Sequence, residues 1–296
     1  MIATLSETGI RPRIVDTRLG PVECARTGEG PAVLLLHGAM GGWDQGLILG
    51  QAAVGAGFEC VAVSRPGYLG TPLRLGPTPA EQADLCGALL DALAIRRAAV
   101  IAISGGGQCA LQLALRRSEL CAGLVMISAC SAPIPGNVPL RFRLMLLAAA
   151  IPAVAAKMRQ KAEANSEAMA ARSIPDAELR ARTLGDGEVG PLFRANLVTT
   201  MSRIPERVSG TRNDIAQARA PFAYPLERIQ APALVIHGTE DEAAPFAQAE
   251  ALAARLPGGE LLAIPGGRHV SLFTHCGTIR ERVTEFLGAH LREEVS

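Results

Sequence analysis

A short glycine-rich turn carries the residue with the clearest chemical potential, Ser104. The turn reads Ala102-Ile103-Ser104-Gly105-Gly106, after an apolar stretch and before a helix-forming one. This strand–turn–helix context is typical of a nucleophile elbow, which needs small residues two positions before and two positions after the nucleophile. Ala102 and Gly106 meet that need, although Ala102 stands where the common motif has glycine. The alternatives are a phosphate-binding loop or a turn needed only for packing.

A serine hydroxyl is a weak nucleophile at neutral pH, so the chemistry requires a base, normally a histidine. We favour His269 because its loop directly follows the last predicted strand, at the same sheet edge as the serine. His275, six residues later, is the runner-up. His37 and His237 each close a strand in a His-Gly pair and are interpreted as turn residues, and His290 lies in a charged terminal helix.

The base must be held in one tautomer by an acid, and the best candidate is Asp241. It follows the penultimate predicted strand, four residues after His237, so it points to the crevice where open α/β sheets place their sites. Glu240 is the neighbouring candidate, and either carboxylate could instead be a surface charge. The loop 128–133, one strand earlier, contains no carboxylate, which favours Asp241 further.

The elements that position these residues alternate between buried strands and helices. Continuous apolar runs, typical of strands buried on both faces, predict strands at 32–36, 58–63, 98–103, 122–128, 233–236 and 261–264. Helices are predicted at 79–93, 107–117, 246–256 and 278–291. This alternation predicts an α/β fold with a mostly parallel central sheet and helices on both faces. Segments 13–18 and 22–26 could form a hairpin at the sheet edge.

The alternation stops between residues 133 and 226, where no strand pattern occurs. This segment has 13 Lys and Arg against 8 Asp and Glu, a net charge near +5, whereas the rest of the chain is near −4. Connections in α/β units are normally much shorter, so we predict a helical cap rather than a plain extension of the helical layer. The expected domains are a core of residues 1–132 and 227–296, and a cap of residues 133–226.

The longest apolar run of the chain lies inside this segment, at residues 144–156, and contains Pro152. At 13 residues it is too short for a membrane span, which needs about 20. Its basic flanks allow an interfacial helix on lipid, but Pro152 and the dispersed charge favour a cap helix with its apolar face over Ser104.

The order Ser104, Asp241, His269 is the chain order of α/β-hydrolases. With the motifs at 37–42 and 64–70, the sequence resembles the α/β-hydrolase fold family over nearly its whole length. Segments 42–46 and 65–68 are similar to a bacterial subgroup of capped serine hydrolases, esterase-like in character.

The resemblance implies an oxyanion hole formed by the backbone N–H groups of Ala39 and Gly105. Such donors bind the negative oxygen of a tetrahedral intermediate. The chain lacks the His-Gly-Gly-Gly form found in some esterases and lipases. Met40 and Trp43 adjoin this loop, and lining the substrate pocket and ordinary core packing are equally good interpretations of both.

The expected activity is hydrolysis of a small or medium acyl substrate, foremost a carboxylic ester, by a Ser104-Asp241-His269 triad. The serine argues against haloalkane dehalogenases and epoxide hydrolases, which resemble this fold but use aspartate there. Carbon–carbon bond hydrolases, aminopeptidases, cofactor-free haloperoxidases and acyltransferases share the triad and stay open, because the fold does not separate them. A non-catalytic ligand-binding protein is a weaker alternative. The mechanism requires no metal and no organic cofactor.

Composition sets further limits on the partners of the protein. Its 296 residues are 49% apolar with a net charge of +1, which favours a large buried core and gives no sign of a nucleic-acid-binding surface. The seven cysteines show no regular spacing and several lie in apolar runs, so we expect buried, reduced thiols in a cytoplasmic protein. The start, residues 1–5, shows no signal peptide, and we expect no stable membrane insertion.

Overall fold

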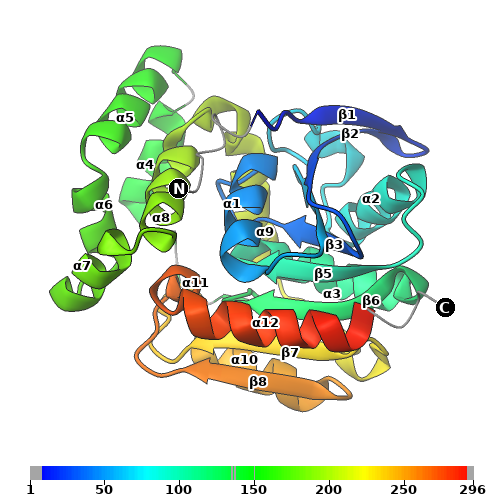
Figure 1. The fold of residues 1–296 in the computed structure, drawn as a ribbon. Coiled ribbons are helices and arrows are strands. Elements are labelled where there is room, and N and C mark those ends of the chain that lie inside the picture. The colour runs from blue at the N-terminus through cyan, green and yellow to red at the C-terminus, as the bar shows by residue number, and fades with distance from the viewer. Residues whose placement is uncertain (1–8, 135, 137, 150, 292–296) are drawn as a thin grey trace.

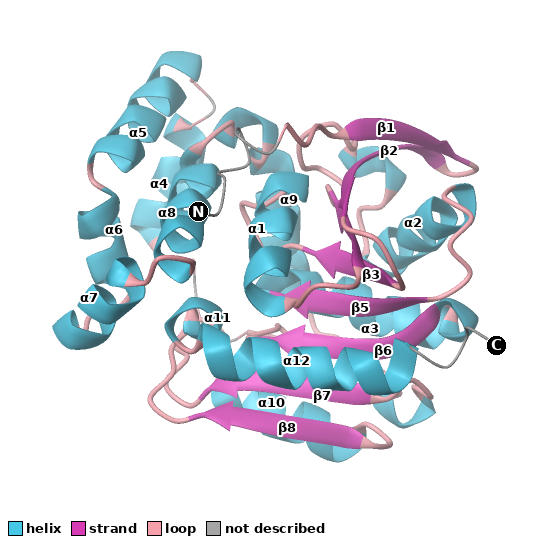
Figure 2. Cartoon of the chain, viewed as in Figure 1, coloured by secondary structure: helices cyan, strands magenta, loops and turns pink. Residues whose placement is uncertain are grey.

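A computed structural model describes residues 9–134, 136, 138–149 and 151–291, and shows one eight-stranded sheet between helical layers (Figures 1 and 2). The strands are β1 (Arg13–Thr17), β2 (Gly20–Thr27), β3 (Ala32–Leu36), β4 (Glu59–Val63), β5 (Ala98–Ile103), β6 (Cys121–Ile127), β7 (Ala233–Gly238) and β8 (Gly259–Ile264). All six strands that the apolar runs predict are present within two residues of their expected limits. Residues 1–5, the segment expected to lack a signal peptide, lie outside the described part.

The strand order is β1-β2-β4-β3-β5-β6-β7-β8. The predicted N-terminal hairpin is confirmed: β1 pairs antiparallel with β2, and β2 pairs antiparallel with β4. From β4 to β8 every neighbouring pair is parallel. The carboxyl ends of β5, β7 and β8 therefore meet at one edge, which is where their following loops bring Ser104, Asp241 and His269.

Helices cover both faces of the sheet. One face carries α1 (Trp43–Ala53) and α12 (Cys276–Leu291), and the other carries α2 (Pro79–Ala92), α3 (Gly107–Arg116) and α10 (Phe246–Arg255) (Figure 1). The side chains of β3 alternate between the two resulting core clusters, with Leu34 in one and Leu35 in the other. Central strands such as β3 and β6 are thus buried on both faces, which explains their continuous apolar runs.

Local sequence accounts for where α2 begins. Thr78 and Glu81 form a capping box around the first turn of α2, and Pro79 occupies its first position. The sequence analysis did not predict α1, which contains Gly46 and Gly50. Small residues are required there: a β-carbon on Gly46 would lie 3.0 Å from the Ala62 side chain, and one on Gly50 would lie 2.5 Å from Leu35. The two glycines let α1 lie directly on the sheet.

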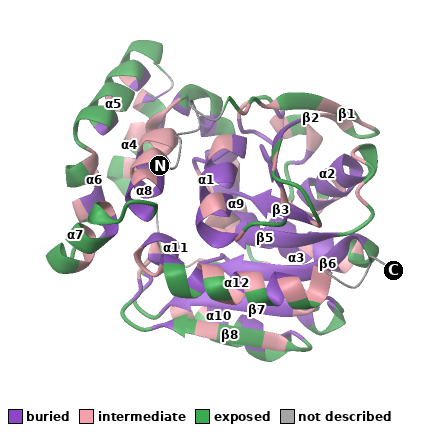
Figure 3. Ribbon diagram, viewed as in Figure 1, coloured by how far each residue is buried: buried purple, intermediate pink, exposed green. Residues whose placement is uncertain are grey.

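Between β6 and β7 the described residues form six α-helices. They are α4 (Leu140–Ala148), α5 (Pro152–Ala164), α6 (Ser166–Ser173), α7 (Ala177–Gly185), α8 (Val189–Met201) and α9 (Val208–Arg219). Helices α5 to α7 lie to the side of the sheet, and α5 and α7 are largely exposed (Figure 3). α8 instead packs against α1. The helical character of the insertion matches the expectation, and its division into a separate cap stays a prediction.

The expected single cap helix over residues 144–156 is wrong. The segment contributes to two helices instead, because α4 ends at Ala148 and Pro152 starts α5. Nor do its apolar side chains all turn inward: Leu144 and Leu147 are 54% and 58% exposed, whereas Leu146 is buried in a small cluster with Ile204.

Two further expectations concern the thiols and the membrane. All seven cysteines lie among the described residues, and all are buried and free of disulfides. Within residues 9–291, apart from the three undescribed positions, we find no helix both long and apolar enough to span a bilayer.

Candidate active site

The turn after β5 has the strained geometry of a nucleophile elbow. Ser104 has a φ of 51°, a left-handed conformation that non-glycine residues rarely adopt. A β-carbon on Gly106 would lie 2.6 Å from the Leu36 carbonyl oxygen, so only glycine fits there. Ala102 is fully buried. The tight turn places half-buried Ser104 where α3 approaches the end of β5.

His269 lies within hydrogen-bonding distance of the serine. Its Nε2 is 3.0 Å from the Ser104 Oγ, and its Nδ1 is 2.8 Å from the Asp241 Oδ2. The bond to the carboxylate keeps the ring proton on Nδ1, so Nε2 can accept the proton of the serine hydroxyl. The fold therefore brings the three predicted residues together, with His269 between the serine hydroxyl and a carboxylate that can stabilise the protonated imidazole.

Asp241 is a buried carboxylate held by several donors. Its Oδ1 accepts hydrogen bonds from the backbone N–H groups of Ala243 and Ala244, at 2.9 and 3.0 Å. Burial by itself would raise the pKa of Asp241, but hydrogen bonds from His237 and His269 outweigh burial and hold this pKa well below its ordinary value. Asp241 thus stays ionised beside the imidazole.

The rival acid and base lie elsewhere. Glu240 is exposed, and its backbone N–H donates to the Gly267 carbonyl oxygen. His275 lies between two helices with its Nδ1 2.9 Å from the Thr274 Oγ1. Burial, with a contribution from Arg182, lowers the pKa of His275. Neither alternative side chain has a recorded hydrogen bond to Ser104 within the described residues.

The other histidines support the scaffold. His37 is fully buried and accepts the Arg65 backbone N–H at 3.1 Å; burial and the nearby Arg65 charge lower its pKa well below the ordinary value. His237, predicted as a turn residue, belongs to β7 itself and has its Nε2 2.8 Å from the Ala244 carbonyl oxygen. His290 packs its ring against Phe286 in α12.

The loop after β3 lies directly against Ser104. A β-carbon on Gly38 would be 3.6 Å from the Ser104 Oγ, and one on Gly105 would be 3.3 Å from the Ala39 nitrogen. Two backbone donors beside a serine hydroxyl are suited to binding an oxyanion.

The sequence model of the alpha/beta hydrolase fold family matches residues 31–275, which include Ser104, Asp241, His269 and the loop that carries Ala39. The chain belongs to this family. The hydrolase is 28% identical over 207 residues to a protein of Pseudomonas savastanoi provisionally named carbamate hydrolase RutD, an alignment that covers 68% of this chain and 71% of that protein.

Solved structures share the fold of this hydrolase almost from end to end. An alpha/beta hydrolase fold protein from Nakamurella multipartita is 32% identical with a TM-score of 0.77, over 94% of this chain and 99% of that one. A thermophilic esterase from Thermogutta terrifontis is 20% identical with a TM-score of 0.67, over 95% of this chain and 99% of that one. The second likeness concerns the fold alone.

The two predicted substrate contacts of the hydrolase are largely enclosed. Trp43 begins α1, is 9% exposed and packs within the core cluster beneath that helix. Met40 is 8% exposed and has a φ of 60°, a second left-handed residue near the serine. The position of Trp43 favours core packing, while a substrate contact for either residue stays a prediction.

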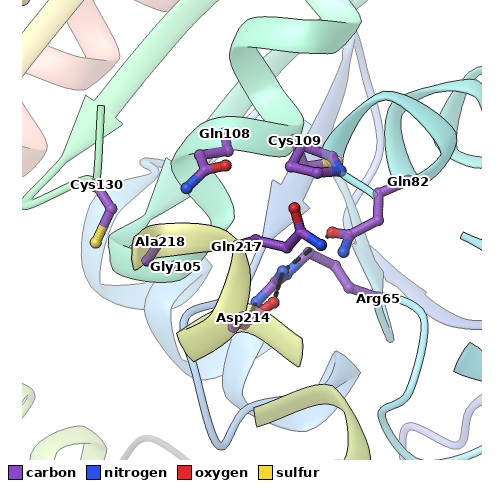
Figure 4. Close-up of a pocket in the computed structure, with 10 residues that line it drawn as sticks. Arg65, Gln82, Gly105, Gln108, Cys109, Cys130, Asp214, Gln217 and Ala218 are labelled. Atoms are coloured by element: carbon purple, nitrogen blue, oxygen red, sulfur yellow. Dashed lines mark hydrogen bonds and ion pairs between the residues drawn. The ribbon is translucent and has the colours of Figure 1, made fainter. Parts of the chain in front are cut away.

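A buried ion pair beside Gly105 escaped the sequence analysis (Figure 4). Arg65 donates from its Nη1 and Nη2 to the two carboxylate oxygens of Asp214, at 2.9 and 2.5 Å. Tyr68 adds a hydroxyl donor to Asp214 at 2.6 Å. The two charged residues are 149 positions apart, so no local motif links them. The only hint in the sequence is an arginine without a neighbouring acidic residue to pair with.

The same region holds a cavity of about 10 Å³, lined by Arg65, Gln82, Gln108, Cys130 and Asp214 among others. That volume accommodates about one water molecule. The Cys130 thiol also contacts Ser104, and burial raises the pKa of this thiol to about 12. Cys130 therefore stays protonated at neutral pH. Across the described residues, no cluster of three or more His, Cys, Asp or Glu is arranged to hold a metal ion.

Proposed function

We propose that this hydrolase cleaves small or medium carboxylic esters through a covalent acyl-enzyme, with Ser104 as nucleophile, His269 as base and Asp241 as acid. The observation that supports this proposal is the continuous hydrogen-bonded chain from the Ser104 Oγ through His269 to Asp241, at 3.0 and 2.8 Å. A histidine base oriented by a carboxylate in this way activates a serine hydroxyl at neutral pH.

In the first half-reaction, the Ser104 Oγ attacks the carbonyl carbon while His269 Nε2 takes the hydroxyl proton. The carbonyl oxygen becomes an oxyanion, which the N–H groups of Ala39 and Gly105 stabilise. As the tetrahedral intermediate collapses, the bond to the leaving oxygen breaks and His269 returns the proton to it. Asp241 stabilises the imidazolium formed between these two transfers.

In the second half-reaction, water replaces the alcohol. His269 removes a proton from water, whose oxygen attacks the acyl carbon and forms a second tetrahedral intermediate in the same oxyanion hole. Collapse expels the Ser104 Oγ, which recovers its proton from His269, and the carboxylic acid leaves. Apart from the substrate and this water molecule, every group in the two half-reactions belongs to the chain.

A fluorophosphonate probe and a series of p-nitrophenyl esters of graded acyl length test this function. We expect one probe per chain, attached to Ser104, and turnover of at least the shorter esters. The alternative of a non-catalytic ligand-binding protein requires an unlabelled Ser104. Hydrolysis of amino-acid p-nitroanilides in preference to every ester would instead support an aminopeptidase.

The relatives named for carbamate hydrolysis support a second candidate substrate class. A carbamate also presents a carbonyl carbon with a leaving oxygen or nitrogen, so the same nucleophile, base and oxyanion hole serve it. Direct comparison of a p-nitrophenyl carbamate with the p-nitrophenyl ester of the same size separates the classes. A higher kcat/KM for the ester supports the first proposal, and a higher value for the carbamate supports the second.

The segment 133–226 is proposed to shape the substrate pocket as a cap. A cavity of about 300 Å³ lies between α4 and α9, lined by Val138, Arg143, Leu146, Leu147, Arg212 and Ile215. Each methylene buried in an apolar pocket contributes about 0.8 kcal/mol. Substitution of Leu146 by Phe should therefore shift the preferred acyl length if this cavity receives the acyl chain.

A further inference from the structure

Helix α9 turns three polar side chains toward the core. They are Arg207, directly before the helix, and Thr211 and Asp214 within it, spaced four and three residues apart on one helical face. Arg207 and Thr211 are fully buried and Asp214 is 8% exposed. Burying such groups is costly unless each finds a partner, so their partners indicate what this face of α9 holds.

Two of them bind the backbone of Met40. The Met40 N–H donates to the Thr211 Oγ1 at 3.2 Å, and Arg207 Nη1 lies 3.5 Å from the Met40 carbonyl oxygen. Arg207 also donates to both carboxylate oxygens of Asp44, at 3.1 and 2.5 Å. Met40 has left-handed backbone angles, a strained state that persists only when its surroundings impose it. The residue so held directly follows Ala39.

The third side chain acts through Arg65. The Nη1 and Nη2 of Arg65 bind Asp214. The same arginine donates from Nε to the His37 carbonyl oxygen at 3.0 Å and from Nη2 toward the Gly38 carbonyl oxygen at 3.4 Å. The two residues before Ala39 are thus fixed by an arginine that α9 itself orients. Ala39 is flanked on both sides by backbone groups held from this helix.

The register of α9 on the core is fixed by close backbone contact. The Gly210 N–H donates to the Gly67 carbonyl oxygen at 2.9 Å, and a β-carbon on Gly67 would lie 2.7 Å from the Gly210 backbone. Helix α9 also comes close to the candidate oxyanion hole. A β-carbon on Gly105 would be 3.1 Å from the Asp214 Oδ2 and 3.3 Å from the Ala39 nitrogen.

We propose that Arg207, Thr211 and Asp214 are positioning residues that hold the Ala39 N–H in the oxyanion hole, so that α9 is part of the catalytic apparatus. The inference rests on the proposed serine mechanism. Donors must be aimed at the position of the developing oxyanion, and displacement by about 1 Å can cost up to a hundred-fold in rate. Loss of one α9 contact should therefore lower the rate of acylation more than it weakens substrate binding.

Thr211 offers the sharpest test, because valine has its shape without the hydroxyl acceptor. Thr211→Val leaves the Met40 N–H without its partner, and Thr211→Ser restores the acceptor. The matched control is Thr183→Val in α7: Thr183 is 4% exposed, and its hydroxyl donates to the Leu179 carbonyl oxygen within its own helix. The fluorophosphonate probe gives a limiting rate of phosphonylation and a separate binding constant, both measured per active site alongside the melting temperature.

We expect Thr211→Val to lower the limiting phosphonylation rate and the kcat for esters about ten- to a hundred-fold with little change in either the probe's binding constant or KM. Thr211→Ser should recover most of the rate, and Thr183→Val should keep it at a comparable loss of melting temperature. Equal rates in the two valine variants would overturn the inference while leaving the serine mechanism intact. A wild-type protein that the probe does not label at Ser104 would instead refute the mechanism, and the inference with it.

Discussion

The His269 Nε2 lies 3.0 Å from the Ser104 Oγ, although 165 residues separate the two in the chain. In the proposed mechanism this contact activates the hydroxyl as the nucleophile, so Ser104→Ala should lower kcat for ester hydrolysis by about five to six orders of magnitude. Steady-state kinetics with a p-nitrophenyl ester measure the loss, and circular dichroism checks the fold. A variant that retains a tenth of the wild-type kcat would exclude Ser104 as the nucleophile.

Replacement of the base should be almost as damaging as replacement of the nucleophile, since members of a triad act as a unit. We expect His269→Ala to approach the activity of Ser104→Ala. The double variant should be little worse than either single variant, as measured by kcat. His275→Ala is the control and should keep near wild-type activity. Multiplicative losses in the double variant would argue that the two residues act independently.

The acid assignment separates two neighbouring carboxylates. Asp241 bonds to His269, whereas exposed Glu240 does not. Asp241→Asn should lower kcat by about four orders of magnitude, because the amide no longer favours the productive tautomer. Glu240→Gln should stay close to wild type. If Glu240→Gln instead showed the large loss of kcat and Asp241→Asn stayed close to wild type, the acid would be Glu240.

The stability of the protein should depend on pH through Asp241. Its pKa lies well below the ordinary value of 3.8, because hydrogen bonds from His237 and His269 outweigh the effect of burial. A carboxyl group with a lower pKa in the folded state stabilises that state above its unfolded pKa, and this contribution is lost as pH falls through the folded pKa. The melting temperatures of wild type and Asp241→Asn should therefore differ most above about pH 5, and the difference should shrink progressively below about pH 4 as the pH approaches the folded pKa of Asp241. A constant difference would contradict this linkage.

Breaking the ion pair between Arg65 and Asp214 should lower the stability of the folded protein as well as its reaction rate. Removing one partner of a buried pair leaves the other charge uncompensated, which costs about 3–5 kcal/mol. Urea unfolding of Asp214→Asn should show a loss of this size. The control is Glu119→Gln, because Glu119 is 61% exposed where it meets Arg117, and exposed pairs contribute about 1 kcal/mol or less. Equal losses would show that Arg65 finds another partner.

The sheet was readable from the sequence because strands such as 98–103 are apolar without interruption, the mark of burial on both faces. The three candidate catalytic residues were readable because each follows such a strand. Helix α1 was not, since its two glycines serve packing against Ala62 and Leu35, which only the folded chain brings near. Asp214 was invisible for a similar reason: its partner Arg65 lies 149 residues away, and nothing local distinguishes it from a surface carboxylate.

The contacts of α9 bear on how this hydrolase could be recombined with its relatives. Exchanging residues 133–226 as one block would remove Arg207, Thr211 and Asp214. Their charged partners Arg65 and Asp44 would then stay in the core without these ion pairs. A breakpoint before Ile204 keeps the pairs and still exchanges α4 to α8. Chimeras cut at these two places should differ in the yield of folded protein. The shorter graft should give the higher yield, and its α8 must still pack against α1.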